Sequence, residues 1–502
     1  MSSRNITIPG FIENAISHLP RFDEIAQPTM VALVGDAGGS GSKVFQSFLD
    51  NHEEIFMIPA YPLMYFYPHW DTWEKELKDT WNWESLIDIF CHKHASVLDS
   101  RNIRGFNGLT ILGKNQDECI KINENVFRSY LLNFLKDQSI HRKVFLLAVH
   151  YAYALCNNED IGRKKALLYH IHSSEYMIDY LMKDFPDLKV MGMVRDPRPN
   201  LKRRFKGSLC NVDDIKLNRT DALIYRKRVY YQACKHVFYN IQLLHSIASN
   251  KLRVIRHEDL VFNLKNIMQR TAEFLQITHA PSMLEISFGG KSWWGDQIYD
   301  MKLTNTVNPS IVSQQWQEEL SKIDWFVIEG LMFDYLKKYG YTIYKYTHDS
   351  LWQRCILAVA IMLPSRIEQR VLKDYLTPMK HIQFLKACID ECTGKVPRKD
   401  YTWNASYLYK WTYIDLKLWR TPWYVTFVSF ARRLEEHRSW QWLGCMITPL
   451  SRLVYVLANY CRYWWAIFTY PLAILKRCKL CYSVYVRRIK KQLFLPEMIN
   501  PE

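Results

Sequence analysis

The sequence predicts an α/β protein in which a parallel sheet forms the middle of three layers, followed by a mostly helical C-terminal region. Short apolar runs bounded by turn residues, with helical patterns between them, are typical of buried parallel strands. The runs are Met30–Val34, Lys143–Val149, Ala166–Ile171, Lys189–Val194 and Leu252–Ile255. At 502 residues the chain is too long for one compact core, so we expect at least two domains.

Three segments between and after these runs have the apolar spacing of helices that cover a sheet. They are Asp221–Ala248, Asn263–Leu275 and Gln317–Tyr339. The third ends at Gly340, where a glycine would cap the helix. Together with the predicted strands, these helices indicate a three-layer α/β domain.

Charge and tryptophan content divide the chain near residue 345. Residues 346–502 hold 24 Lys and Arg against 11 Asp and Glu, and 9 of the 17 tryptophans. The remainder is nearly neutral, so the two parts should meet different partners. We therefore predict one domain over 1–345 and a helical, basic, Trp-rich region over 346–502.

The apolar runs of this C-terminal region are interrupted by charged residues and proline. The longest, Leu453–Leu475, contains Arg462 near its middle, which disfavours a membrane span. Aromatic and basic residues mixed with aliphatic ones are typical of helices that lie at a lipid interface. We expect peripheral membrane contact there, and the alternative is a helical domain packed on the first domain.

The N-terminus and the cysteines indicate a reducing compartment. Residues 1–33 show no signal peptide or membrane anchor, so we expect a cytoplasmic protein on the inner face of a membrane. The 12 cysteines have no regular spacing, and the pair Cys478 and Cys481 lacks the further ligands of a zinc site. Neither a disulfide framework nor a metal is predicted, and no partner is expected among nucleic acids.

The first motif runs from the apolar strand at Met30–Val34 through a turn rich in glycine and serine into an amphipathic helix. This layout suits phosphate binding, because glycines let backbone N–H groups close on an anion. The candidate ligands are Gly39, Ser40, Gly41, Ser42 and Lys43. The spacing is not that of a Walker A motif. A glycine-rich turn without a ligand is the alternative.

Two further motifs follow predicted strands. Arg195, in Arg195-Asp-Pro-Arg198, lies at the carboxyl end of a strand, and a guanidinium can grip a phosphate with two hydrogen bonds. The alternative there is a surface turn with an incidental ion pair. His257-Glu-Asp-Leu260 follows the last strand and by itself indicates only a strand, a turn and a helix.

In this order, the three motifs resemble those of the sulfotransferase superfamily that uses 3′-phosphoadenosine 5′-phosphosulfate (PAPS). The resemblance covers about residues 28–345 and includes Lys291-Ser-Trp-Trp-Gly-Asp296, which is similar to the family's loop over the nucleotide. It implies a P-loop-like PAPS-binding core, with Lys291 among the binding residues. Two positions depart from the family. Gly39 replaces the usual basic residue, with Lys43 as substitute, and Arg203 replaces the serine that binds the 3′-phosphate.

The resemblance also implies the chemistry, which is transfer of a sulfuryl group from PAPS to a hydroxyl. Lys43 would stabilise the charge that develops during transfer, and Arg195 and Arg203 would hold the 3′-phosphate. The base would be His172 or His170, which lie two residues apart on a strand, with His150 and Glu175 as alternatives. The acceptor would be a glycan, a lipid-linked saccharide or another alcohol.

Two other functions stay open at this point. One is a catalytically inactive sulfotransferase-like module bound to a membrane, which the glycine at position 39 favours. The other is a P-loop kinase, which the failed Walker spacing disfavours.

Overall fold

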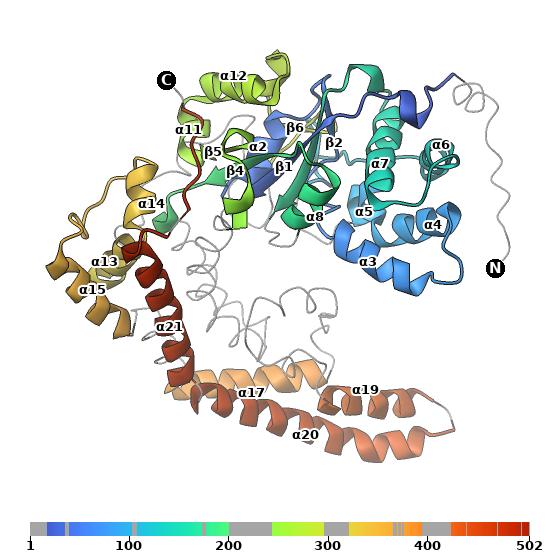
Figure 1. The fold of residues 1–502 in the computed structure, drawn as a ribbon. Coiled ribbons are helices and arrows are strands. Elements are labelled where there is room, and N and C mark those ends of the chain that lie inside the picture. The colour runs from blue at the N-terminus through green and yellow to red at the C-terminus, as the bar shows by residue number, and fades with distance from the viewer. Residues whose placement is uncertain are drawn as a thin grey trace.

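The computed structural model describes residues 18–35, 40–102, 108–172, 177–199, 243–295, 321–364, 376–393, 423–437, 439–468, 470–492 and 494–500, with positions 369 and 373. In these residues a parallel sheet carries helices on both faces, and a set of C-terminal helices extends away from it (Figure 1). The predicted α/β class and the helical C-terminal region are therefore confirmed.

The main sheet of the described chain has five parallel strands in the order β2-β3-β1-β4-β5. The strands are β1 (Thr29–Gly35), β2 (Ile55–Met57), β3 (Ala166–His172), β4 (Lys189–Val194) and β5 (Leu252–Arg256). Four of them match predicted runs. The fifth, β2, has three residues, too few to show a strand pattern. Because β1 lies between β3 and β4, the carboxyl ends of these three strands meet at one edge.

Alternate residues of β1 enter two separate cores, one on each face of the sheet. Met30, Ala32 and Val34 pack with the segment between β2 and β3 and with α8 (Met177–Asp184). Val31 and Leu33 pack with α2 (Ser42–Phe48) and α12 (Leu264–Leu275) on the other face. This is the arrangement of a sheet buried on both faces, and it confirms the three layers.

A helical segment connects β2 to β3. Its helices are α3 (Phe66–Glu76), α4 (Trp83–Lys93), α5 (Ala95–Leu98), α6 (Glu124–Leu135) and α7 (Arg142–Cys156). The predicted strand at Lys143–Val149 is wrong, because these residues lie in α7, and His150 lies within that helix rather than at a strand end. Every residue of α7 from Phe145 to Ala154 is buried, so its apolar run has no exposed side to reveal the helical period.

After β5 the chain forms α11 (His257–Phe262) and α12, then a two-stranded hairpin of β6 (Ser287–Phe288) and β7 (Lys291–Ser292). The predicted helix at Asn263–Leu275 is confirmed as α12. The helix predicted over Gln317–Tyr339 is divided into α13 (Lys322–Leu331) and α14 (Phe333–Lys338), and Gly340 follows with a φ of +66°. Asp221 to Asn240, most of the remaining predicted helix, lies outside the described residues, and Leu243–Ser246 forms a 3-10 turn.

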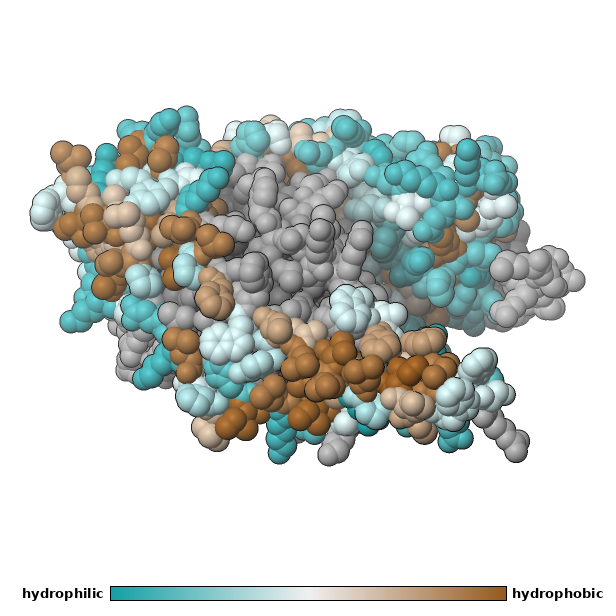
Figure 2. All heavy atoms as spheres, turned by 90° about the horizontal axis from the view of Figure 1, so that it is seen from below, coloured by the Kyte–Doolittle hydropathy of each residue, from teal (hydrophilic) through white to brown (hydrophobic). Residues whose placement is uncertain are grey.

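The C-terminal helices are α15 (Leu351–Met362), α17 (Pro378–Cys392), α19 (Trp423–Glu436), α20 (Gln441–Phe468) and α21 (Tyr470–Ile489). In the space-filling view from below, a hydrophobic band runs along this part of the molecule (Figure 2). Within the described chain, no helix combines the length and the apolar content needed to cross a bilayer. The segment Leu453–Leu475 belongs partly to α20 and partly to α21.

The end of the chain returns to the sheet. The N–H of Val254 in β5 donates to the carbonyl of Glu497 at 2.9 Å, and the N–H of Ile499 donates to the carbonyl of Val254 at 2.8 Å. Residues of α15 and α21 share one buried cluster with α13, α14, the end of β4 and the middle of β5. The domain boundary near residue 345 stays a prediction, and these contacts tie both sides of it together.

Candidate functional site

The turn after β1 follows a strand that lies between β3, which ends at His172, and β4, which is followed by Arg195. Val34 pairs with His172 in β3, and Gly35 pairs with Met193 in β4, two residues before Arg195. In parallel α/β sheets, the carboxyl edge beside such a central strand is the usual ligand site. The structure therefore brings the first motif, the histidine strand and the arginine motif to one edge.

Gly41 holds the turn against the third motif. Its φ of +94° is in the left-handed region, and a Cβ at this position would lie 2.3 Å from Nδ1 of His257. A side chain at position 41 would therefore clash with the His257 ring. Ser40 precedes Gly41, and Ser42 and Lys43 begin α2 directly after it. All three side chains are buried. Gly39 lies outside the described residues.

His170 positions one of these serines. Its Nδ1 lies 2.8 Å from Oε1 of Gln46, and its Nε2 lies 3.1 Å from the Ser42 hydroxyl. The Gln46 amide donates to the carbonyls of Ile58 and Ala60, at 3.1 and 2.9 Å, so its oxygen faces the ring. Nδ1 therefore carries a proton and donates to Gln46, and in the neutral ring Nε2 accepts the hydrogen of the Ser42 hydroxyl.

These contacts bear on the two predicted bases. His170 is buried and uses both ring nitrogens to fix α2 side chains, which makes it a positioning partner of Ser42. The backbone of His172 ends β3 beside Val34, and its side chain is outside the described part of the structure, as is Glu175. A bulge between the paired residues Leu33–His170 and Val34–His172 interrupts the alternation assumed for the two histidines. The identity of the base stays a prediction.

Lys43 is held between two aromatic rings. Its Nζ lies 5.5 Å from the ring centroid of Tyr61 and 5.6 Å from that of Trp293. The Tyr61 ring also meets the His170 ring edge to face, with centroids 5.5 Å apart. Aromatic faces attract a cation within about 6 Å, so the two rings favour the ammonium group at its buried place next to the turn.

The β6–β7 hairpin that carries Trp293 is tied to α2 through Asp50. This carboxylate accepts hydrogen bonds from the Ser287 hydroxyl at 2.8 Å and from the N–H groups of Gly289 and Gly290 at 3.1 and 2.9 Å. Burial raises the pKa of Asp50, and the three donors lower it in part. Sequence reasoning missed Asp50, because its partners lie more than 230 positions away.

Lys291 does not join Lys43 at the turn. Its ammonium pairs with the carboxylate of Glu118, and both side chains are partly exposed. Trp294 donates from its indole N–H to the carbonyl of Gly113 at 2.6 Å, which fixes the end of the same loop. Trp293 is the residue of this loop that contacts Lys43, and nucleotide binding by Lys291 stays a prediction.

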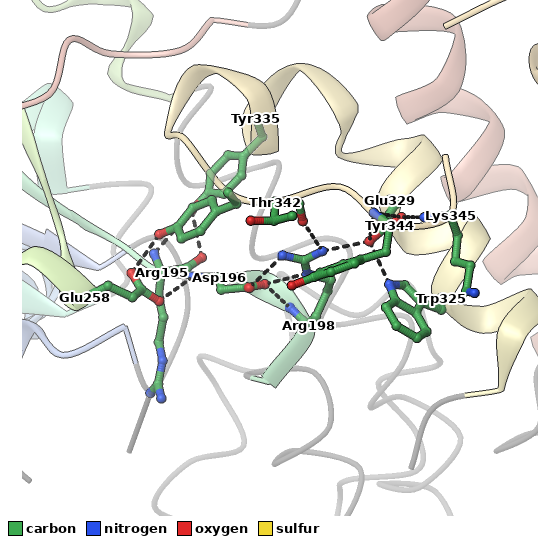
Figure 3. Close-up of polar contacts among 11 residues, drawn as sticks. Arg195, Asp196, Arg198, Glu258, Trp325, Glu329, Tyr335, Thr342, Tyr344 and Lys345 are labelled. Carbon is green, nitrogen blue, oxygen red and sulfur yellow. Dashed lines mark hydrogen bonds and ion pairs between the residues drawn. The ribbon is translucent and has the colours of Figure 1, made fainter. Parts of the chain in front are cut away.

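The two arginines of the second motif have different surroundings (Figure 3). Arg198 is buried and binds Asp196 through two nitrogens, at 2.9 and 2.8 Å. It also donates to Glu329 at 2.7 Å and to the Thr342 carbonyl at 2.6 Å, so it joins the end of β4 to α13. This residue is part of the framework.

Arg195 is anchored by its backbone. The Tyr335 hydroxyl donates to the Arg195 carbonyl at 3.0 Å and lies 3.3 Å from its N–H. In Figure 3 the Arg195 guanidinium points away from the hydrogen bonds that join Asp196 and Arg198. These hydrogen bonds therefore do not set the direction of the Arg195 side chain. Its side chain is buried at the sheet edge where the first motif turns. Arg203 lies outside the described residues.

Glu258 joins the second and third motifs. It accepts a hydrogen bond from the N–H of Asp196 at 3.1 Å and one from the Tyr341 hydroxyl at 2.8 Å. Burial raises the pKa of this carboxyl group. With the contact between His257 and Gly41, the third motif touches both of the others. Three separate segments of sequence thus build one site.

The site offers cations and hydroxyls to an anionic ligand. Lys43 lies in the first turn of α2, which follows β1, and Arg195 directly follows the neighbouring strand β4. Ser40 lies in the turn between β1 and α2, and Ser42 begins α2. In the part of the chain that the structure describes, no group of three or more His, Cys, Asp or Glu side chains could hold a metal ion. Such a set can bind a ligand with more than one phosphate or sulfate group.

Comparison with known proteins found solved structures that are similar to this chain, but no curated protein with a similar sequence. No protein-family model matches the chain, and no curated protein matches its sequence. Similar solved structures include the sulfotransferase domain of the curacin biosynthetic pathway, with a TM-score of 0.35 and 14% identity over 63% of this chain and 99% of that domain.

Two further solved structures are similar. The sulfotransferase domain of the Synechococcus PCC 7002 olefin synthase has a TM-score of 0.33 and 14% identity, over 58% of this chain and 88% of that one. Sulfotransferase STF9 of Mycobacterium avium has a TM-score of 0.28 and 15% identity, over 54% and 70%.

Proposed function

We propose that this protein transfers a sulfuryl group from PAPS to a hydroxyl of an acceptor molecule. The observation that carries the proposal is the convergence of the three motifs at one sheet edge. There Gly41 packs on His257, and Glu258 binds the N–H of Asp196. The cation Lys43 lies in the first turn of α2 after β1, and the cation Arg195 follows the neighbouring strand β4.

The residues present fit a nucleotide with separate anionic groups. A glycine with no room for a Cβ lets the backbone approach a phosphate closely, and Ser40, Ser42 and Lys43 surround it in sequence. We assign the 5′-phosphosulfate to this turn and the 3′-phosphate to Arg195. Arginine suits that role because its guanidinium can form two parallel hydrogen bonds to phosphate oxygens.

PAPS would supply a sulfuryl group already attached to a good leaving phosphate. Lys43 would then place a fixed positive charge where charge develops during transfer, and such preorganised charges contribute most when water is excluded. Tyr61 and Trp293 keep the ammonium in place through their ring faces. His170 keeps the Ser42 hydroxyl oriented. His172 at the end of β3 is the proposed group that takes the acceptor proton.

The acceptor belongs to the hydroxyl-bearing class of glycans, lipid-linked saccharides and other alcohols. Binding of the product nucleotide, 3′-phosphoadenosine 5′-phosphate (PAP), tests the proposal without knowledge of the acceptor. Isothermal titration of the full chain should show PAP binding. Arg195→Ala should weaken it by about 1.5–3 kcal/mol, the usual contribution of a hydrogen bond to a charged group. Arg270→Ala is the control, because Arg270 is half exposed and pairs with Glu273 on α12.

Three outcomes separate the possible functions. PAP binding together with transfer of labelled sulfate from PAPS to an alcohol, glycan or lipid supports the sulfotransferase. PAP binding without transfer to any acceptor class would indicate the inactive binding module. Binding and turnover of ATP in place of PAP would indicate a kinase, and the proposal would then be wrong.

A further inference from the structure

The helix α20 has its polar and apolar sides reversed relative to a helix of a water-soluble bundle. Its buried face carries the small or polar residues Gly444, Thr448 and Ser451 and the aromatic Tyr455, spaced by four, three and four positions. Tyr455 packs with Cys392 and Val428 in a small buried cluster. Gly444 lies so close to α19 that a Cβ there would be 2.2 Å from the backbone nitrogen of Glu435. Thr448 donates to the Glu435 carboxylate at 3.2 Å.

The opposite face of α20 is apolar and exposed. Its residues recur at helical spacing, and each exposes between 39 and 71% of its surface. We call this set the apolar stripe: Trp442, Met446, Leu450, Leu453, Leu457 and Trp464. A helix in water normally turns such a row toward the core. The arrangement therefore predicts an apolar environment outside the protein.

The apolar stripe continues onto neighbouring helices. Phe468 at the end of α20 is 76% exposed, and Leu472 and Leu475 on α21 are 56 and 63% exposed. Met379 and Ile382 of α17 are exposed as well. Figure 2 shows a continuous hydrophobic band along these helices on one face of the molecule. Contiguous exposed apolar surface of this extent marks an interaction site.

The charge of the same segment identifies the partner. Residues 437–496 contain 10 Lys and Arg and no Asp or Glu. Lys479 and Arg487 on α21 and Lys490 just after it are exposed. The helices α20 and α21 thus combine an apolar line with charged residues that are all positive, which is complementary to a bilayer with anionic headgroups. A second copy of the chain would bring two such positive segments together, which repulsion disfavours.

We propose that the apolar stripe docks on the surface of an anionic lipid bilayer, with α20 lying in the plane of the interface. From Trp442 to Phe468 the helix measures roughly 39 Å at 1.5 Å per residue, so it offers an extended line of contact. Trp442 and Trp464 lie near its two ends, where amphipathic rings favour the headgroup region. This inference does not depend on the chemistry at the sheet edge.

Vesicle flotation with the full-length protein tests the docking. One set of vesicles contains phosphatidylcholine alone, and the other contains phosphatidylcholine with phosphatidylglycerol. The variant Leu453→Ser/Leu457→Ser removes two side chains of the apolar stripe that are 55 and 54% exposed. Because each would transfer about half of a leucine surface into the interface, the variant should lower partitioning by about tenfold or more. The control is Leu132→Ser/Ile323→Ser, two exposed apolar residues on α6 and α13.

The proposal requires the unaltered protein and the control to float with the anionic vesicles, more weakly with neutral ones, and the stripe variant to stay behind. Circular dichroism and thermal unfolding of all three establish that each is folded. Absence of flotation of the unaltered protein would overturn the proposal, as would equal flotation of the stripe variant. If analytical ultracentrifugation instead shows a dimer that the stripe variant loses, without vesicle binding, the partner is a second copy and the bilayer is excluded.

Discussion

Replacing Arg198 with alanine should destabilise the protein, whereas replacing Arg195 should mainly weaken nucleotide binding. The Arg198 side chain donates two hydrogen bonds to Asp196 and one each to Glu329 and the Thr342 carbonyl. Breaking a buried ion pair by removing one partner costs about 3–5 kcal/mol. The lower end applies here, because Glu329 keeps N–H donors from Trp325, Tyr344, Lys345 and Tyr346 after the change.

We therefore expect Arg198→Ala to lower the free energy of unfolding by about 3 kcal/mol. Arg195→Ala leaves the backbone bonds to Tyr335 intact and should cost less stability. Thermal unfolding of both variants, and calorimetric titration with PAP at a temperature where both are folded, separates the two effects. Arg198→Lys is a further control, since it keeps the charge but cannot form the two parallel bonds to Asp196.

The assignment of roles would be refuted by the reverse pattern. If Arg198→Ala unfolds at the temperature of the unaltered protein and fails to bind PAP, Arg198 is the phosphate ligand. If Arg195→Ala loses as much stability as Arg198→Ala, Arg195 belongs to the framework, and the site loses its proposed 3′-phosphate ligand.

Three further predictions follow from the site and from the fold. Lys43→Ala should reduce turnover far more than PAP affinity, because a cation at the transferring group acts mainly in the transition state. Equal losses of turnover, measured by kinetics, and of PAP affinity, measured by calorimetry, would show that Lys43 is only a phosphate ligand. Asp50→Ala should lower the free energy of unfolding by about 2 kcal/mol, as measured by thermal unfolding. It should also weaken PAP binding, because it releases the hairpin that carries Trp293. Unchanged PAP affinity would show that PAP binding does not need the hairpin. Burial lowers the pKa of His150 to about 4, so as the pH falls below 6.5 the unfolded chain takes up a proton at this residue and the folded chain does not. Between pH 7.0 and 5.5 the His150→Gln variant should therefore lose about 1 kcal/mol less stability than the unaltered protein. Denaturant unfolding at the two pH values measures both losses, and equal losses would contradict the prediction.

Local sequence patterns predicted the sheet where strands are long and bounded by turns. Met30–Val34 and Lys189–Val194 are strands because each is a short apolar run that ends in turn residues. The run Lys143–Val149 has the same composition but belongs to α7, which packs on all sides. Composition alone does not separate a buried strand from a buried helix.

The sequence predicted the outline of the site, because each motif is a local pattern. It did not predict the contacts within the site, because those contacts join segments that are far apart in the sequence. The turn at Ser40–Lys43 and the strand end at Arg195 follow from strand-turn-helix patterns. The sequence does not distinguish Arg195 from Arg198, since only the packing of α13 shows which one is bound to Glu329. The pairing of His170 with Ser42 spans 128 positions and leaves no local signal.

The reversed polarity of α20, by contrast, is a local pattern. Apolar residues recur every three or four positions from Trp442 to Trp464, and small or polar residues recur on the other side. The sequence indicates an amphipathic helix there, and the prediction of membrane contact used its charge and aromatic content. Which side is buried depends on the packing of α19, through Gly444 and Thr448.

The structure of the protein determined with bound PAP tests the central claim most directly. The account predicts the 5′-phosphate at the turn formed by Ser40–Lys43, within hydrogen-bonding distance of the Lys43 ammonium, and the 3′-phosphate on the Arg195 guanidinium. It also predicts that Arg198 keeps its bonds to Asp196 and Glu329 in that complex. A nucleotide bound elsewhere, or with neither phosphate on Lys43 or Arg195, would contradict the proposed site and the sulfuryl transfer built on it.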